Sequence, residues 1–589
     1  MNIKNIVGEK LSEVILNMYQ LKDINLEVQE NKTEFEGDFT IVTFPLVKQL
    51  KKNPESIAVE LGEALTTQTD LLENFNVVKG FLNIKIRNQF FLGNLKSVSE
   101  GIDAVEPKNA TVMIEYSSPN TNKPLHLGHI RNNLLGFSVS QILKEAGYDV
   151  IRTQIINDRG IHICKSMLAW EKFGNGSTPE AAHTKGDKFV GNYYVEFDKQ
   201  YKQQISGLMQ DGMTEEQAKK EAPLIKEAQA MLLDWESGDE NVRNLWKEMN
   251  AWVYAGFNET YKRLGVEFDQ VQYESNTYIL GKDLIQQGLD KGVLYRKEDG
   301  SVWCDLTDEG LDQKLLLRSD GTSVYMTQDL GTAVERFKQN NIQKLIYTVG
   351  NEQDYHFQVL FKILKKLGYE WADHLYHLSY GMVELPNGKM KSREGTVVDA
   401  DDLMQEMYET AKAKAIELGK LEGLSEEARE ASYETVGIGA LKYFMLKVDP
   451  KKKMLFNPEE SIEFNGNTGP FIQYTYARIQ SLLAKADAGY AEVKDYTQVE
   501  LNESEKELIM LLANYKPVVE KAAESLSPAQ IANYVYELVK AYNSFYQSNI
   551  ILKLEDEQLK NFRLSLSDLT AKVIKKALRL LGIETVNRM

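Results

Sequence analysis

Apolar residues recur along the chain in two different periods, and these periods predict where helices and strands lie. Near the N-terminus the apolar positions are three or four residues apart, as on one face of a helix. Residues 53–65 indicate a second helix with Pro54 at its first position. Residues 75–86 alternate as a pair of strands. This mixture predicts a small α+β domain over residues 1–105, followed by a short linker.

A β–α–β unit follows the linker. Residues 110–117 and residues 149–156 are compact apolar runs of strand length. Between them, residues 126–148 carry apolar positions on one helical side, with Gly147 near the end. Two strands joined by a helix predict a parallel sheet.

The α/β pattern returns after a long interruption. Residues from about 170 to 280 are charged, helical and rich in tryptophan, which predicts a helical insertion. Strand patterns then appear at residues 344–350 and 374–383, with a helical pattern between them. We therefore predict one parallel-sheet domain over residues 106–400 that contains the insertion.

The last third of the chain has helical periodicity almost throughout. The segment that begins at Ser527 has this residue at the expected N-cap and Pro528 in the first turn. Its apolar positions step by four and three, which gives one apolar face of the kind that usually packs in a core. We predict a helical connector over residues 401–464 and an all-helical domain over residues 465–589.

Composition favours a cytoplasmic protein with several domains. Of the 589 residues, 43% are hydrophobic and 26% are charged, as in soluble globular proteins. The sequence contains neither the apolar run of a signal peptide nor a stretch as long as a membrane span. Its two cysteines, Cys164 and Cys304, exclude a disulfide framework and a four-cysteine zinc site.

The net charge of −17 argues against a nucleic-acid partner, but the charge is unevenly distributed. The last thirty residues contain seven basic and two acidic residues, a local net charge of +5, and Lys451, Lys452 and Lys453 form a second basic patch. Each patch fits phosphate contacts, and each fits a solvated helix face equally well. The seven basic residues are Lys560, Arg563, Lys572, Lys575, Lys576, Arg579 and Arg588.

Two histidines and a glycine crowd into one turn in "KPLHLGH", residues 123–129, between a predicted strand and a predicted helix. Ligands of open α/β sheets bind at this edge, and a helix start offers free N–H groups to an anion. His126 and His129 can share one helix face, and Gly128 lets a flat ring or a phosphate approach. The pattern favours a phosphate whose charge rises during a reaction. For a bare H-x-G-H motif, two ordinary capping or surface histidines are the alternative.

A glycine-flanked basic loop, "GKMKSREG", follows the last predicted strand and contains Lys389, Lys391 and Arg393. Such a loop can neutralise departing pyrophosphate. Together, the H-x-G-H turn and the later K-M loop resemble the HIGH and KMSKS pair of class I aminoacyl-tRNA synthetases. "EYSSPNTNKPLHLGHIRNNLLG", "SVYMTQDLGTA", "GNEQDYHFQVL" and "FNGNTGPFIQYTYARI" narrow the resemblance to arginyl-tRNA synthetases, in the right order and over essentially the whole chain.

The resemblance implies a fold and an activity. It implies a Rossmann-like catalytic domain with a helical insertion, a small N-terminal α+β domain that binds tRNA, and a helical C-terminal anticodon-binding domain. The activity would be formation of arginyl-adenylate and pyrophosphate from arginine and ATP, then transfer to the 2′-hydroxyl of the terminal adenosine of tRNA. Mg²⁺ would accompany ATP, since no separate cluster of metal ligands is visible. The resemblance also implies a monomer that binds arginine-accepting tRNA, and no membrane.

The resemblance also implies which residues act. The arginine site would contain Glu115, Asn120, Tyr325, Asp329 and Gln353, and carboxylates suit a guanidinium. From the residues alone, Glu115 is equally suited to pair with a protein arginine, and Asp329 to cap a helix. The ATP site would contain His126, Gly128, His129, Lys389, Met390, Lys391 and Arg393.

One position departs from the family's pattern. The second lysine of the KMSKS motif is Ser392 here. In arginyl enzymes that share this loss, a lysine just before the HIGH motif supplies the charge, and Lys123 matches that lysine. Lys391 and Arg393 are alternatives. We therefore predict Lys123, His126, His129 and Lys389 as the catalytic residues, acting through charge stabilisation.

Three other functions fit parts of the pattern. A nucleotidylyltransferase of the same superfamily would be shorter and would lack the helical C-terminal half. A class I synthetase for glutamate or glutamine would require a cationic pocket, and one for cysteine would require zinc-ligating cysteines. A non-catalytic RNA-binding relative would not need the intact histidine turn. Four tyrosines, Tyr474, Tyr476, Tyr542 and Tyr546, are candidates to stack on tRNA bases.

Overall fold

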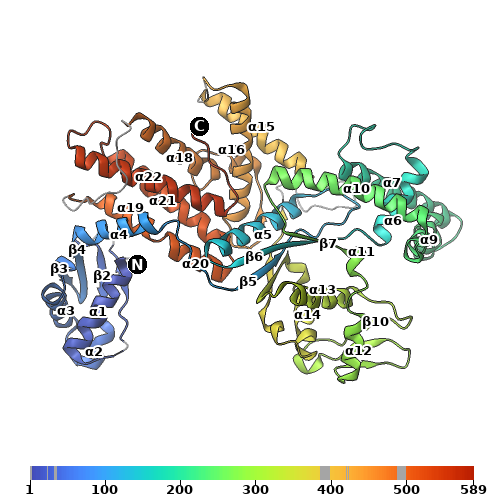
Figure 1. Cartoon of the computed structure of the whole chain (residues 1–589), viewed down its shortest axis with the longest axis horizontal. Coiled ribbons are helices and arrows are strands. Elements are labelled where there is room, and N and C mark those ends of the chain that lie inside the picture. The colour runs from blue at the N-terminus through green and yellow to red at the C-terminus, as the bar shows by residue number, and fades with distance from the viewer. Residues whose placement is uncertain are drawn as a thin grey trace.

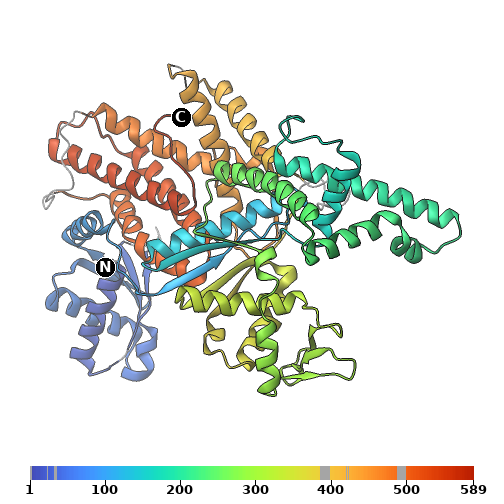
Figure 2. The same cartoon turned by 45° about the vertical axis from the view of Figure 1, so that its right-hand side comes forward.

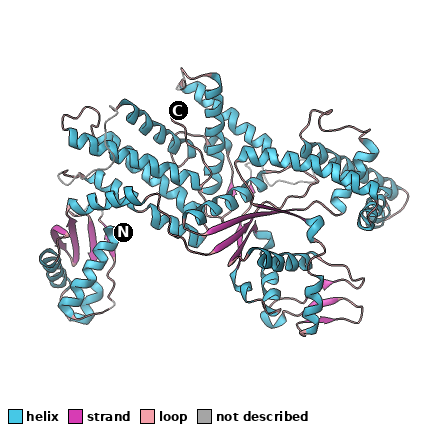
Figure 3. Ribbon diagram, in the orientation of Figure 1, coloured by secondary structure: helices cyan, strands magenta, loops and turns pink. Residues whose placement is uncertain are grey.

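The computed structural model of the chain describes residues 3–22, 24–31, 36–384, 398–419, 421, 423–486 and 499–589. It is mostly helical and is built around one parallel sheet, with a separate antiparallel sheet near the N-terminus (Figures 1 and 3). The predicted α/β multidomain fold is confirmed, since the chain has the parallel sheet, a helical C-terminal region and a distinct N-terminal region.

The N-terminal region is a small α+β unit, as its mixed periodicity predicts. Its four strands form an antiparallel sheet in the order β1-β2-β4-β3, with helices packed against it. Asn53 caps the second of the predicted helices by accepting a hydrogen bond from the Glu55 N–H, and Pro54 is the first helical residue. The elements are α1 (Ile3–Tyr19), β1 (Val28–Glu30), β2 (Phe39–Val42), α2 (Phe44–Leu50), α3 (Pro54–Gln68), β3 (Leu72–Val78), β4 (Phe81–Ile86) and α4 (Asn88–Gly101).

The central sheet has five parallel strands in the order β12-β11-β5-β6-β7. Two of its strands have the predicted limits, because each is a short apolar run with polar residues on both sides. Helices cover both faces, as parallel sheets require. The elements are β5 (Thr111–Glu115), α5 (Leu127–Glu145), β6 (Asp149–Ile156), β7 (Gln270–Tyr273), α13 (Tyr325–Asn340), β11 (Lys344–Gly350), α14 (Asp354–Lys366) and β12 (Leu375–Tyr380).

Alternation along β5 assigns its side chains to two separate cores. Val112 and Ile114 belong to a core shared with α5 and the C-terminal helices, whereas Met113 belongs to a second core formed with α13 and α14. Helix α5 approaches the sheet closely at Gly136, where an added Cβ would lie 2.3 Å from the Tyr116 side chain. Residue Glu115 follows Met113 by two positions, so its carboxylate points toward α13.

The helical insertion lies between β6 and β7 and projects from the right side of the sheet in Figures 1 and 2. Its tryptophans pack edge to face in two pairs, Trp170 with Trp252 and Trp235 with Trp246, which explains their enrichment. The elements are α6 (Ile161–Phe173), α7 (Gly186–Gln210), α8 (Glu215–Glu221), α9 (Pro223–Ser237) and α10 (Glu240–Leu264). Strand β7 returns to the sheet before residue 280, so the insertion ends about ten residues earlier than the pattern suggests.

A second interruption, which the hydrophobic pattern did not predict, separates β7 from α13. It contains a three-stranded antiparallel sheet in the order β10-β9-β8, drawn at the lower right of Figure 3. Asp299 and Gly300 stand between two of its strands, and an Asp-Gly pair between apolar runs is a recognised hairpin signal. The elements are α11 (Glu274–Thr277), α12 (Lys282–Asp290), β8 (Leu294–Arg296), β9 (Val302–Cys304) and β10 (Lys314–Leu317).

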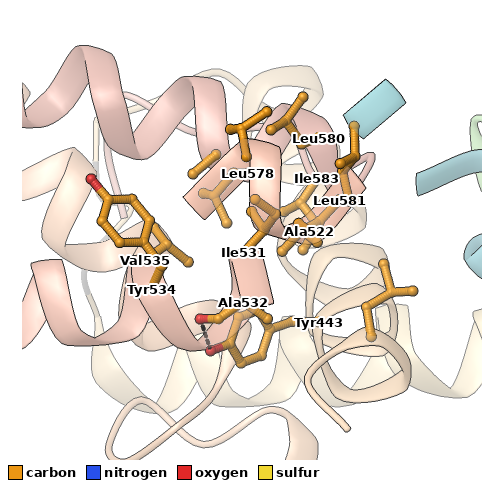
Figure 4. Packing of buried hydrophobic residues seen from close by; sticks show 14 of the residues in the cluster. Tyr443, Ala522, Ile531, Ala532, Tyr534, Val535, Leu578, Leu580, Leu581 and Ile583 are labelled. Atoms are coloured by element: carbon orange, nitrogen blue, oxygen red, sulfur yellow. Dashed lines mark hydrogen bonds between the residues drawn. The ribbon is translucent and has the colours of Figure 1, made fainter. Parts of the chain in front are cut away.

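The C-terminal third is helical, and its apolar faces meet in one core. Figure 4 shows part of this core, where the Tyr443 hydroxyl donates to the Ala532 carbonyl at 2.9 Å among apolar side chains of α20, α21 and α22. The elements are α15 (Ala400–Leu418), α16 (Glu426–Leu446), α17 (Pro458–Ser461), α18 (Gly469–Lys485), α19 (Glu503–Ala513), α20 (Tyr515–Ser525), α21 (Pro528–Ser548) and α22 (Glu557–Leu580), with a two-strand pair formed by β13 (Val383–Glu384) and β14 (Met454–Leu455).

Two local predictions need correction. Ser527 occupies the N-cap position of α21, but its side chain does not form the expected capping hydrogen bond. Helix α5 begins at Leu127, with His126 as its N-cap and not as its first helical residue. The proposed domain limits at residues 105, 400 and 464 remain our predictions. No helix in the described ranges is long and apolar enough to cross a membrane.

Candidate active site

The parallel strands bring the predicted site residues to one edge of the central sheet. Glu115 is the last residue of β5, and Asn120 forms a single parallel bridge with Asn157, which directly follows β6. Gln353 ends a 3-10 turn that begins immediately after β11. Parallel strands share their carboxyl edge, and ligands of open α/β sheets bind there.

The rings of the two histidines in the β5–α5 turn accept hydrogen bonds from backbone N–H groups of the same turn. The Nδ1 atom of His126 accepts from the Gly128 N–H at 3.1 Å, and the Nδ1 atom of His129 accepts from the His126 N–H at 3.1 Å. Both Nδ1 atoms therefore lack a proton, so each neutral ring carries its hydrogen on Nε2. The ring centroids are 3.9 Å apart. The turn thus presents two Nε2–H donors on adjacent rings.

Burial keeps both rings neutral. It lowers the pKa of His126 to about 4 and the pKa of His129 well below its ordinary value, and the positive charge of Lys123 lowers both further. The pKa of Lys123 is itself lowered by burial. Lys123, which precedes His126 by three residues, is thus close enough for its charge to act on both histidines.

The expectation of free N–H groups at this helix start is wrong for the N-cap and for the first two helical residues. The N–H groups of His126 and Gly128 donate to the histidine rings, and the Leu127 N–H donates to the Val398 carbonyl at 3.2 Å. An anion here therefore meets the ring Nε2–H groups instead of bare backbone. Gly128 leaves room for this arrangement, since an added Cβ would lie 3.0 Å from the His126 ring and would press on it.

Helix α5 is fixed by two neighbours of the motif that the sequence pattern did not single out. The fully buried Arg131 donates to the carbonyls of Gly381, Pro450 and Lys452 at 2.6, 3.2 and 3.0 Å. The Asn132 side chain accepts from the Ser117 N–H at 2.6 Å and donates to the Thr348 carbonyl at 2.6 Å. These hydrogen bonds of Arg131 and Asn132 join the start of α5 to segments at the edge of the sheet, and they thereby hold the two histidines in place.

The predicted basic loop falls in residues 385–397, so Lys389, Met390, Lys391 and Arg393 lie outside the described residues. The segment that follows is fixed to the histidine turn. Asp399 forms an antiparallel bridge with His126, and the Ala400 N–H donates to the Leu125 carbonyl at 2.9 Å.

Glu115 forms an ion pair with a protein arginine, which was the alternative that the residues left open. Its Oε2 lies 2.5 Å from Nη1 of Arg336 on α13, and the two side chains are 8% and 1% exposed. The other carboxylate oxygen, Oε1, accepts a long 3.4 Å bond from the Ser118 hydroxyl. Arg336 thus supplies, from the chain itself, a cation for the buried carboxylate of Glu115.

Tyr325 and Asp329 lie one turn apart on α13. Tyr325 is the first residue of the helix and is 74% exposed. Asp329 is inside the helix, not at its cap, and its Oδ2 lies 2.6 Å from Nε2 of His356. The helix-capping alternative for Asp329 is therefore wrong, and the carboxylate faces the same side as the tyrosine.

Glu274, which the motifs did not indicate, is the first residue of α11 and comes directly after β7. Burial raises its pKa to about 7, and repulsion from Asp158 and Asp329 adds to this effect, against the attraction of Arg159. In the sequence, a carboxylate at the end of a fourth parallel strand is a signal that could have identified Glu274 as a candidate site residue. Because the predicted insertion extended to about residue 280, this strand end was not recognised.

A cavity of about 460 Å³ opens between the helical insertion and the start of α13. Glu274 and Tyr325 line it, together with Arg159, whose guanidinium lies 2.5 Å from Glu236 and stacks on the Tyr278 ring. The cavity thus combines one carboxylate with a raised pKa, aromatic surface and several cationic side chains. The carboxylate suits a cationic substrate, and the cationic side chains suit an anionic one.

The C-terminal basic patch is smaller than the sequence suggests. Arg563 is 8% exposed and its Nε donates to Glu505 at 2.8 Å, while Lys576 lies 3.0 Å from Asp103 and 3.1 Å from Glu145. These two cations hold helices together and do not face a partner. Lys575 and Arg579 are exposed on α22.

Three families match successive parts of the chain. Residues 94–457 match the class I (R) tRNA synthetase catalytic domain, residues 472–589 match the DALR anticodon binding domain, and residues 1–86 match the arginyl tRNA synthetase N-terminal domain. The matches follow the order of the regions in the fold.

Relatives agree with this chain over the whole length. The arginine–tRNA ligase of Flavobacterium psychrophilum is 56% identical over 604 residues and covers 100% of both chains. That of Bacteroides thetaiotaomicron is 56% identical over 96% of each chain. Among solved structures, the Thermus thermophilus arginyl-tRNA synthetase is 26% identical with a TM-score of 0.78 and full coverage of both chains. The Plasmodium falciparum enzyme, at 19% identity and a TM-score of 0.75, shares the fold.

Proposed function

The chain belongs to the class I arginyl-tRNA synthetases and is an arginine–tRNA ligase, and from this premise we propose which of its side chains carry the reaction. Arginine, ATP and tRNA are the substrates that this activity requires. The proposal concerns the residues that bind each of them and the order in which they act.

The guanidinium of arginine binds between the carboxylates of Asp329 and Glu274, with the Tyr325 hydroxyl as a third partner. Carboxylates hold a planar guanidinium through charge-assisted hydrogen bonds. The observation that carries this assignment is that Glu274 and Tyr325 line one cavity, with Asp329 one turn further along α13. Burial raises the pKa of Glu274, and repulsion from Asp329 adds to the rise against the attraction of Arg159. A bound guanidinium would offset that repulsion.

The other end of arginine lies toward the carboxyl ends of β5 and β11. Oε1 of Glu115 has capacity for the substrate's ammonium, because Arg336 occupies only Oε2. Asn120 and Gln353 are exposed at the same sheet edge and complete this end of the site. This placement directs the carboxylate of arginine toward the histidine turn on α5.

The histidine turn binds ATP. The arginine carboxylate attacks the α-phosphorus, which forms arginyl-adenylate and releases pyrophosphate. The Nε2–H groups of His126 and His129 stabilise the charge that develops on the phosphates, and Gly128 keeps the turn open. Since both rings are already neutral, they donate without changing protonation state during the reaction.

Lys123 adds the positive charge that Ser392 does not provide. Its pKa effect on both histidines supports this assignment. Lys389, Met390, Lys391 and Arg393 are assigned to the ATP phosphates by their match to the family's motif. Mg²⁺ accompanies ATP, as the activity implies, and the ATP phosphates are among its ligands.

Transfer completes the reaction. The 2′-hydroxyl of the terminal adenosine attacks the carbonyl carbon of the adenylate, its proton leaves, and AMP is released. No protein nucleophile takes part, so catalysis consists of positioning and charge stabilisation.

The helical C-terminal region binds the anticodon part of tRNA. Lys575 and Arg579 offer contacts to phosphates. Of the four candidate tyrosines, Tyr476 and Tyr542 are buried in the core, whereas Tyr474 and Tyr546 are half-buried around Arg478 and remain candidates for stacking. We further propose a cytoplasmic monomer.

ATP–pyrophosphate exchange with each of the twenty amino acids, with and without arginine-accepting tRNA, tests the proposal. Exchange is expected with arginine alone, and only when tRNA is present. Strong exchange with another amino acid would contradict the arginine site.

A further inference from the structure

A second cavity lies between α10 and the strands β6 and β7, at the edge of the central sheet where α10 runs above β7 in Figure 1. Its volume is about 490 Å³, and small-molecule sites occupy about 300–1,000 Å³. Tyr273 ends β7 and lines this cavity, whereas the next residue, Glu274, lines the cavity of about 460 Å³. The end of β7 therefore separates the two. Among the described residues, none that we assign to arginine or ATP lines the second cavity.

A buried amide faces this cavity without a partner. Gln154 of β6 is only 2% exposed and lines the cavity. Ile156, two positions further along the strand, lines it as well, because alternate side chains of a strand point to the same face. Within the part of the chain that the structure describes, the Gln154 side chain forms no hydrogen bond, although buried polar groups are normally bonded. A ligand in the cavity would supply the missing donor and acceptor.

Aromatic rings line the same cavity. They belong to Tyr254, Phe257, Tyr261, Phe268 and Tyr273. The rings of Tyr254 and Tyr273 are 5.2 Å apart, and those of Tyr261 and Phe268 are 5.1 Å apart. Aromatic side chains of this kind stack on flat rings such as nucleobases. The cavity therefore joins a stacking surface to one amide that reads polar atoms.

The charges at the cavity do not favour a phosphate. Lys262 and Glu267, which are exposed and opposite in sign, are the charged residues that line it among those that the structure describes. A phosphate group is held by several charge-assisted hydrogen bonds, and one lysine beside a carboxylate offers too little positive charge for it. An uncharged ligand fits this rim better than a nucleotide does.

We propose that this cavity binds an uncharged adenine nucleoside. The amide of Gln154 presents a donor and an acceptor side by side, which match the N7 and N6 atoms of adenine. The aromatic rings stack on the base, and the sugar lies toward Lys262 and Glu267. The cavity is thus a binding site of its own, separate from the histidine turn that we assign to ATP.

The test measures equilibrium binding of adenosine to the full-length enzyme, with the active site saturated by a non-hydrolysable sulfamoyl analogue of arginyl-adenylate. The analogue keeps adenosine out of the ATP site. The first variant, Gln154→Leu, removes the amide and keeps the size of the side chain. The second, Val271→Trp, fills the cavity from a residue that is 43% exposed on β7. Gln286→Leu is the matched control, because Gln286 is exposed on α12 and bonds only to Asp290 of the same helix.

Wild type and control should each bind one further equivalent of adenosine, and ATP should displace little of it. Gln154→Leu should weaken this binding by about 10-fold, within the range expected for one bidentate pair with a base. Its melting temperature should not fall, since the amide has no partner in the fold. Val271→Trp should abolish the second equivalent while the analogue stays bound. This variant decides the test if Gln154→Leu folds poorly, because it leaves the amide in place.

Two kinds of result would overturn the proposal. One is the absence of a second equivalent in the wild type, or a second equivalent that both variants bind as tightly as the wild type does. The other is full displacement of the bound adenosine by ATP or by tRNA, which would assign the cavity to that occupant instead.

Discussion

Asp38 and Lys506 are 468 residues apart in the sequence, yet Oδ1 of the aspartate lies 3.0 Å from Nζ of the lysine, and the side chains are only 3% and 2% exposed. The other carboxylate oxygen of Asp38 accepts from the Ile86 N–H at 2.6 Å. The residue before Lys506, Glu505, pairs with Arg563 of α22. The start of α19 thus joins the N-terminal sheet to the C-terminal helices through buried charges.

Lys506→Met should destabilise this junction, because it leaves the Asp38 carboxylate buried without a counter-charge. We expect a loss of about 3–5 kcal/mol in the free energy of unfolding of the affected region, the usual cost of breaking a buried pair. Denaturant unfolding measures it. Asp38→Asn in the same chain should restore most of the loss, since it removes the charge and keeps an acceptor for the Ile86 N–H.

Lys10→Met is the matched control, because the Lys10–Glu13 pair is exposed on both sides. Exposed pairs contribute little to stability, so this change should be nearly neutral. If Lys506→Met costs no more than Lys10→Met, the buried pair does not stabilise the junction.

Lys123→Ala should slow adenylate formation by about 10²-fold, the scale expected for removal of one charge-stabilising group. The KM for arginine should change little, since Lys123 lies beside the histidines. Arginine-dependent pyrophosphate exchange in the presence of tRNA measures both. Lys172→Ala, which breaks an exposed pair with Glu227 on the insertion, is the control. Unchanged activation would indicate that Lys391 or Arg393 supplies the charge.

His126→Asn separates capping from catalysis. Asparagine is among the best N-cap residues, so the variant should keep the start of α5 and the melting temperature of the wild type. It lacks the Nε2–H donor, and exchange should fall by about 10²–10³-fold. Full activity in this variant would mean that His126 only caps the helix.

Glu274 predicts a pH dependence of arginine binding. Its pKa is about 7, so it is mostly protonated at pH 6 and mostly ionised at pH 8. Because a guanidinium binds the ionised form, the KM for arginine should fall as the pH rises from 6 to 8 and then level off. Glu274→Gln should have a raised KM without this pH step. An identical pH profile in the variant would assign the step to another group.

Asp329→Asn should raise the KM for arginine far more than the KM for ATP, since the change removes a charge beside the guanidinium and keeps the side-chain shape. The helix should be unaffected, because Asp329 is not its cap. Steady-state exchange with each substrate varied in turn measures both constants. Equal rises would count against a role in arginine binding.

The local pattern of the chain predicted its elements well. Strands β6 and β11 have the predicted limits, and Asn53 and Pro54 start α3, because these features depend on residues within a few positions of each other. The small sheet from β8 to β10 was missed although its turn residues carry a signal, since short strands in a charged context have weak periodicity.

For the candidate site, the motifs name residues but not the contacts that these residues make. The motifs located the histidine turn, Lys123 and the residues of α13. The residues left open that the histidines cap the helix and that Glu115 pairs with a protein arginine; the structure shows both contacts and identifies the arginine as Arg336. Glu274 stayed hidden because its strand end is separated from the others by the insertion.

The sequence by itself determined many of the helices and strands, the presence of a parallel sheet and the activity, because these follow from local periodicity and from motifs read in order. Only the tertiary structure decided which charges are paired, which basic residues face solvent, and which carboxylate is left at a pKa near 7. Those properties depend on burial and on the distance between charges, and both arise only when remote segments such as the neighbourhoods of Asp38 and Lys506 pack together.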